Sequence, residues 1–105
     1  MFKDSFTPEI KQELTDKIAN VIVHNKSFIE MNIITIFYSK CAELFPNESV
    51  FTDTYYTCLD SAIISNLFTG KKEKKSVKLI AQNITENLVD IVDENVETIK
   101  KITAK

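Results

Sequence analysis

Five acidic residues near the carboxyl end of the chain have a spacing at which carboxylates could hold a divalent cation. They recur at i, i+4, i+7, i+8 and i+11, which places them on one face of a helix: Glu86, Asp90, Asp93, Glu94 and Glu97. A di-iron bundle, however, requires Glu-x-x-His motifs and inward-facing carboxylates, and the single histidine of this chain lies in no such motif. We therefore expect a solvated acidic face, or one that docks a basic partner, and neither a metal nor a cofactor.

A cluster of lysines lies just before this acidic segment, between residues 70 and 78. Its members are Lys71, Lys72, Lys74, Lys75 and Lys78. A basic loop that leads into a helix could bind a phosphate through Ser76, the first free N–H groups and the ammonium groups. The stretch has no Gly-x-Gly or Walker pattern and no aromatic residue for stacking on a base. A solvated loop is therefore the simplest interpretation, contact with an acidic protein the second, and binding of nucleic acid or phosphate the third.

Nucleophilic catalysis would have to combine His24 with Cys41 or Cys58, because the chain contains no other imidazole or thiol. The histidine is expected near a helix carboxyl terminus, where the helix dipole favours a cation. Both cysteines lie among aliphatic and aromatic residues, where a free thiol behaves as a small core residue. A reducing cytosol would disfavour a disulfide between them. We therefore expect no enzymatic activity.

The composition indicates one folded domain. The chain has 105 residues, 44% of them hydrophobic, and a formal net charge of −2, which excludes a disordered tail and gives no general attraction to nucleic acid. One glycine and two prolines are too few for the many turns of a β-sandwich or barrel. These values favour long elements and few turns.

The same sequence indicates a cytoplasmic protein. Its first residues contain no apolar stretch typical of a signal peptide, and charged residues interrupt the apolar runs before the ~18 residues that a membrane span needs. All thirteen basic residues are lysine. Because AT-rich coding sequences favour lysine over arginine, this indicates a phage, a virus or an AT-rich bacterium as the source.

Four segments have the apolar period of amphipathic helices. We expect these helices at residues 8–24, 28–45, 50–69 and 76–103. Thr7 and Ser76 are N-cap candidates, Ser27 with Glu30 forms a capping box, and Gly70 is expected to end the third helix. In the second segment, the isoleucine-rich run 31–38 leaves a β-strand as the competing prediction. The predicted fold is a single all-α domain over residues 1–105.

Short links between four helices predict an antiparallel up-down-up-down bundle with a long C-terminal helix. At 1.5 Å per residue, the last helix would be roughly 42 Å long and the others about 27 Å, so its end should overhang. The second segment is apolar almost all round, whereas a bundle covers about half of each helix. We therefore expect a surplus of apolar surface that binds a partner. The candidate partner-binding residues are Ile34, Phe37, Ile64, Phe68, Val92, Val96, Ile99 and Ile102.

The sequence thus predicts a small non-enzymatic protein–protein interaction module. Its first partner would be itself, as a homodimer or higher oligomer, and the next a protein that it inhibits or neutralises. Immunity proteins, antitoxins and phage or viral inhibitors are built at this size and class, a comparison that rests on architecture alone. The alternative is a nucleic-acid-binding regulator that uses the lysines of residues 71–78. A third hypothesis is a small-molecule pocket lined by Tyr55, Tyr56 and the cysteines.

Overall fold

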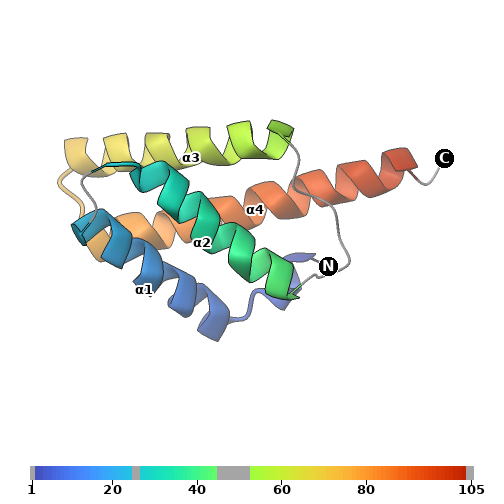
Figure 1. The fold of residues 1–105 in the computed structure, drawn as a ribbon, viewed down its shortest axis with the longest axis horizontal. Coiled ribbons are helices and arrows are strands. Elements are labelled where there is room, and N and C mark those ends of the chain that lie inside the picture. Colours follow the sequence, from blue (N-terminus) through green and yellow to red (C-terminus); the bar gives the residue numbers. More distant parts are fainter. Residues whose placement is uncertain (1, 25–26, 45–52, 104–105) are drawn as a thin grey trace.

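The chain folds into four α-helices preceded by one short 3-10 helix (Figure 1). The computed structural model describes the backbone of residues 2–24, 27–44 and 53–103 and the side chains of residues 4–24, 27–44 and 58–94. The elements are η1 (Phe2–Ser5), α1 (Pro8–His24), α2 (Ile29–Leu44), α3 (Asp53–Lys72) and α4 (Val77–Thr103). The all-α four-helix prediction is therefore confirmed. The competing strand over residues 31–38 is wrong, because this run lies within α2.

The helices form a ring in which each one contacts its neighbours. The long helix α4 packs against α1 and α3, α2 packs against the same two helices, and η1 packs on α4. Consecutive helices run in opposite directions, and the last turns of α4 extend past the ends of the other helices (Figure 1). The body measures 46 × 25 × 21 Å. As a result, α1 and α3 end, and α2 and α4 begin, at the same end of the bundle.

Two helices begin at the N-caps that the sequence predicts. At α1, the hydroxyl oxygen of Thr7 accepts a hydrogen bond from the Ile10 amide at 3.3 Å. At α4, the hydroxyl oxygen of Ser76 accepts one from the Leu79 amide at 3.2 Å. Each bond satisfies an amide that the first turn of a helix leaves without an intrahelical partner.

The start of α2 differs from the predicted capping box by one residue. The carbonyl of Phe28 accepts the first helical hydrogen bond, from the Asn32 amide at 3.0 Å, so Phe28 and not Ser27 occupies the N-cap position. Phe28 has a φ of 57°, which lies outside the right-handed helical region. The helix therefore cannot include Phe28 and begins at Ile29.

The end of α3 also differs from the predicted one. The helix continues through Gly70 to Lys72, and the residue with positive φ is Lys74, at 55°. The Lys75 amide donates to the Gly70 carbonyl at 2.9 Å and the Lys74 amide to the Lys71 carbonyl at 3.3 Å. This pair of bonds is a Schellman motif with lysine in the place that glycine usually takes.

Gly70 is required by helix packing and not by its backbone angle. A Cβ atom at this position would lie 2.5 Å from both Cδ1 and Cγ1 of Ile80. The absence of a side chain therefore lets α4 approach α3 closely just after the turn. Sequence alone does not reveal this role, because residues 70 and 80 belong to different helices.

The core contains apolar side chains from all four helices and from the segment after η1. Its buried members are Phe6, Leu14, Ile18, Val21, Ile33, Ile34, Phe37, Cys41, Leu59, Ile63, Ile80, Ala81, Ile84, Leu88, Val89 and Val92. Two threonines also lie within it: the Thr15 hydroxyl donates to Oγ1 of Thr85 at 3.1 Å, and the Thr85 hydroxyl donates to the Ala81 carbonyl at 3.0 Å. These bonds satisfy the buried hydroxyls and join α1 to α4. Within the described part of the chain, no helix is both long and apolar enough to cross a membrane.

Candidate functional site

Three of the eight predicted partner-binding residues are buried in the core, so their prediction as surface residues is wrong. Phe37 and Val92 are fully buried, and Ile34 is 3% exposed. The ring of Phe6 stacks on Phe37 with the ring centroids 5.9 Å apart, so the segment after η1 covers a part of α2 that a simple four-helix bundle would leave open. Val92 is covered because α4 lies between α1 and α3.

Two of the predicted residues do face solvent, on the outer face of α3. Ile64 is 51% exposed and Phe68 is 68% exposed, and their i, i+4 spacing makes them neighbours on one face of the helix. The remaining three, Val96, Ile99 and Ile102, lie in the last turns of α4, where the side chains are outside the described residues.

Exposed apolar side chains gather where α1 and α3 end and where α2 and α4 begin. Among the described residues, the large apolar side chains that are exposed are Val23, Phe28, Met31, Ile64, Phe68 and Leu79. Four of them lie within three residues of a helix terminus at this end. Phe68 is four residues, about 6 Å, from the end of α3, and Ile64 is eight residues, about 12 Å, from it. The ribbon shows the four termini together at the left of Figure 1.

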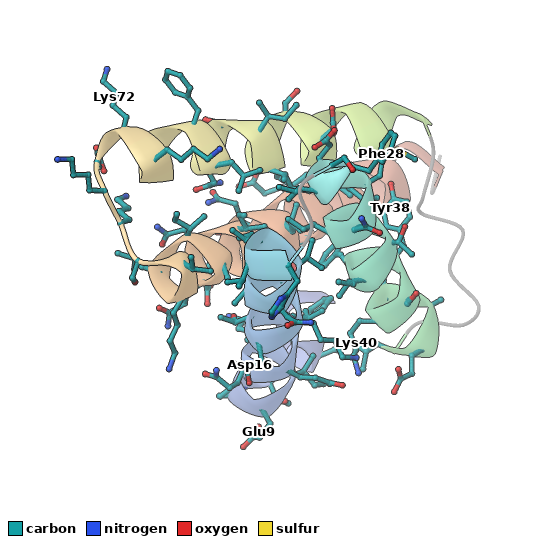
Figure 2. All side chains as sticks on the ribbon, turned by 60° about the vertical axis from the view of Figure 1, so that its left-hand side comes forward. Glu9, Asp16, Phe28, Tyr38, Lys40 and Lys72 are labelled. Carbon is teal, nitrogen blue, oxygen red and sulfur yellow. The ribbon has the colours of Figure 1, made fainter. Side chains whose placement is uncertain are left out.

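The predicted basic cluster lies at this same end, which we call the lysine end. Lys71, Lys72, Lys74 and Lys78 are exposed, whereas Lys75 is half-buried and pairs with Glu73 at 3.1 Å. Figure 2 shows Lys72 pointing away from the bundle at the end of α3 and Phe28 at the start of α2. Only part of the cluster is a loop, because Lys71 and Lys72 belong to the last turn of α3, where the helix dipole favours cations.

The predicted acidic face of α4 is partly covered and partly paired. Glu86 is exposed and its carboxylate pairs with Nζ of Lys11 on α1 at 3.3 Å. Asp90 and Asp93 are half-buried, Glu94 is exposed, and the side chain of Glu97 is outside the described residues. Within the described side chains, no group of three or more histidine, cysteine or acidic residues is arranged to hold a metal ion.

The two thiols lie far along their helices from the end of the bundle where His24 lies: Cys41 is twelve residues, about 18 Å, from the start of α2, and Cys58 is fourteen residues, about 21 Å, from the end of α3. Cys41 is buried in the core, and this burial raises the pKa of its thiol to about 12, so it is a protonated thiol at neutral pH. Cys58, which the helical period places on the inner face of α3, is exposed instead, and both cysteines are free. His24 is exposed at the end of α1. The side chains of Tyr55 and Tyr56, predicted to line a pocket, lie outside the described residues.

A pocket that the sequence does not predict lies between the segment after η1, α1 and α4. It has a volume of about 350 Å³ and is lined by Phe6, Pro8, Lys11, Gln12, Thr15, Gln82 and Glu86. Two of these lining residues, Lys11 and Glu86, form an ion pair at 3.3 Å, so their opposite charges already neutralise each other. Sequence spacing gives no signal for this pocket, since its two walls are about 70 residues apart.

A partly buried ion-pair network ties α2 to α1. The ammonium of Lys40 lies 2.8 Å from Glu13 and 3.4 Å from Glu43, and Glu13 also pairs with Lys17 at 3.3 Å. Figure 2 shows Lys40 on the side of α2 that faces α1. Hydrogen bonds from Lys40 and then Lys17 lower the pKa of Glu13, and the bond to Glu13 raises the pKa of Lys40. This network is structural, because its charges are matched across the helix interface.

No protein-family model matches the chain, and no curated protein or solved structure is similar enough to count as a match. Function must therefore be argued from the surface of this molecule itself. Two surface features have no role in the core or in its ion pairs. They are the outer face of α3 and the lysine end.

Proposed function

We propose that this chain is a non-enzymatic protein-binding module whose first partner is a second copy of itself, and which also binds and neutralises a second protein. The observation that carries the proposal is the exposure of Ile64 and Phe68, at 51% and 68%, on the outer face of α3. The opposite face of the same helix holds Leu59 and Ile63, which are fully buried. The outer pair is therefore apolar surface that folding of one copy does not use.

The pattern of α4 extends this argument. Its apolar period continues through Val96, Ile99 and Ile102, in turns that extend past the ends of the other helices (Figure 1). An apolar helix stripe that continues past the neighbouring helices is typical of an interface between chains. Since interfaces between copies of one chain are most often two-fold, a dimer is the simplest assembly.

The chemistry of the candidate nucleophile supports a role without catalysis. A thiol with a pKa of about 12 is not a nucleophile at neutral pH, because the thiolate is the reactive form. The acidic group Glu86 is paired with Lys11. The buried Cys41 thiol and the paired Glu86 carboxylate therefore support a binding role.

Light scattering coupled to size-exclusion chromatography tests the proposal. We expect the wild-type chain to be dimeric at micromolar concentrations and the variant Ile64→Ser/Phe68→Ser to be monomeric. The matched control is Val23→Ser/Met31→Ser, which removes two side chains of similar exposure, 58% and 51%, from other helices and should remain dimeric. A wild-type monomer at these concentrations, or equal dissociation of both variants, would contradict the proposal.

A second candidate function is nucleic-acid binding through the lysine end. The observation that favours it is the exposure of Lys71, Lys72, Lys74 and Lys78, at the end of α3, in the link after it and at the start of α4. Binding of this kind weakens steeply with salt, because each phosphate contact releases counterions. An electrophoretic shift at about 50 mM salt on duplex DNA, single-stranded DNA and RNA would detect it. Absence of a shift on all three would exclude this candidate.

A further inference from the structure

The lysine end combines exposed ammonium groups with exposed apolar side chains, and we propose that it docks on an anionic lipid surface. The occupant differs from that of the proposed self-association, and the surface borders on the outer face of α3, because Lys72 lies one turn from Phe68 on that helix. In this arrangement the lysines contact headgroup phosphates and carboxylates, and the apolar side chains insert between the headgroups. Peripheral proteins bind membranes through this pairing of apolar and basic groups.

The apolar part of the surface is contributed by separate helix termini. Val23, Phe28, Met31 and Leu79 are 58%, 67%, 51% and 41% exposed, and they come from the end of α1 and the starts of α2 and α4. They lie on separate helix termini at the end of the bundle where all four helices meet (Figure 1). A fluid lipid surface can contact apolar side chains that are spread over several termini, whereas a protein partner would need a matching surface.

The backbone at two helix termini of this end holds residues in a conformation that large side chains rarely adopt. Among the residues that the structure describes, the non-glycine residues with positive φ are Phe28 and Lys74, at 57° and 55°. Both belong to the lysine end. This conformation is unfavourable for residues with a large side chain, and such strain often marks functional sites. Here it presents an aromatic ring and an ammonium group to solvent at the same end.

The local charge fits an anionic surface although the chain as a whole has a net charge of −2. Four lysines of this end are exposed, Lys75 pairs with Glu73 at 3.1 Å, and Glu30, in the first turn of α2, is half-buried. The long axis of 46 Å exceeds the Debye length of about 8 Å at physiological salt. A surface that contacts the lysine end is therefore screened from most of the acidic groups farther along α4.

The same charges disfavour a second copy as the occupant of this end. A two-fold contact would place the lysines of one copy against those of the other, and this repulsion opposes association. The acidic face of α4 offers no simple complement, since Glu86 already pairs with Lys11 in its own chain. The phosphates of a nucleic acid would attract the lysines, but Val23, Met31 and Leu79 would add little to its affinity. The apolar residues therefore distinguish a lipid surface from nucleic acid.

Co-sedimentation with vesicles tests the proposal. We expect the wild-type chain to bind vesicles of phosphatidylcholine mixed with phosphatidylserine and not vesicles of phosphatidylcholine alone. The variant Lys71→Gln/Lys72→Gln should weaken binding about 25-fold, at about fivefold for each lysine. The control Lys11→Gln/Lys17→Gln makes the same change in net charge on α1, away from the lysine end, and should bind like wild type. Light scattering on these variants keeps vesicle binding separate from self-association, which we expect to be unchanged.

A second variant, Phe28→Asn/Met31→Gln, distinguishes a lipid surface from a soluble polyanion. Asparagine adopts positive φ readily, so this variant should fold, and thermal unfolding would verify that it does. It should bind the mixed vesicles at least tenfold more weakly than wild type. Three results would overturn the proposal. The first is no preference for the anionic vesicles, and the second is equal losses in the two lysine variants. The third is unchanged binding by the apolar variant together with complete competition by an oligonucleotide, which would assign the end to nucleic acid.

Discussion

The interface between α1 and α4 and the lysine end of the same bundle differ in how they use similar residues. At the interface, apolar side chains such as Leu14 and Leu88 are fully buried, and the buried Thr15 and Thr85 hydroxyls are hydrogen-bonded to each other. At the lysine end, an aromatic residue is 67% exposed and adopts a backbone conformation with φ of 57°. The interface is therefore optimised for folding, whereas the lysine end retains features that folding alone does not favour.

The largest effect should come from truncating a side chain of the interface. Leu88→Ala removes a fully buried side chain from α4 and should lower the free energy of unfolding by about 3 kcal/mol or more, because it leaves a cavity. Leu79→Ala makes the same change on the same helix at a position 41% exposed and should cost less than about 1 kcal/mol. Urea denaturation measures both. Equal losses would remove the distinction between the two regions.

The next effect concerns the close approach of α3 and α4 beside the lysine end. Gly70→Ala would place a Cβ 2.5 Å from side-chain atoms of Ile80 and should destabilise the fold by about 1–3 kcal/mol through overpacking. In an Ile80→Ala background the two atoms at 2.5 Å are gone and the Cβ of residue 80, at 3.6 Å, makes an ordinary van der Waals contact, so the same substitution should cost less. If the cost of Gly70→Ala is the same in both backgrounds, the contact with Ile80 is not its cause.

A smaller effect, of opposite sign, tests the strain at the lysine end. Lys74→Gly should raise the free energy of unfolding by about 1 kcal/mol, because glycine adopts positive φ without a steric penalty. Lys72→Gly, two residues earlier and within the helix, should lower it by about 1 kcal/mol. If the lysine end binds anionic lipid, Lys74→Gly should also weaken vesicle binding, so that stability and binding change in opposite directions.

The smallest effect should be the pH dependence of the ion pairs between α1 and α2. Because the pKa of Glu13 is lowered in the fold by Lys40 and Lys17, its contribution is present above the ordinary glutamate pKa of about 4.3 and is lost as pH falls through the lower folded value. Glu13→Gln should therefore reduce the difference in stability between neutral pH and pH near 3. Chemical denaturation at several pH values measures this slope, and an unchanged slope would show that other carboxylates determine it.

Local sequence signals predicted the helices well because their causes are local. Thr7 and Ser76 cap the helices that they were expected to cap, since each hydroxyl accepts a bond from an amide three residues later. Gly70 does not end α3 as the local pattern predicts, because its role is the close contact with Ile80 in the next helix.

The candidate surface was predicted only in part. Ile64 and Phe68 are exposed as expected, but Phe37 is covered by Phe6 and Val92 by the neighbours of α4, and helical period cannot show which faces a neighbouring segment will cover. The lysine cluster was visible in the sequence. The sequence does not show that this cluster lies beside exposed apolar residues of α1, α2 and α4, because their proximity depends on which helix termini meet in the fold.

The most direct test of a binding role is the oligomeric state of the chain measured by light scattering, with wild type and Ile64→Ser/Phe68→Ser at the same micromolar concentration. The account predicts a dimer for the first and a folded monomer for the second. A wild-type chain that remains monomeric while Ile64 and Phe68 face solvent would contradict it.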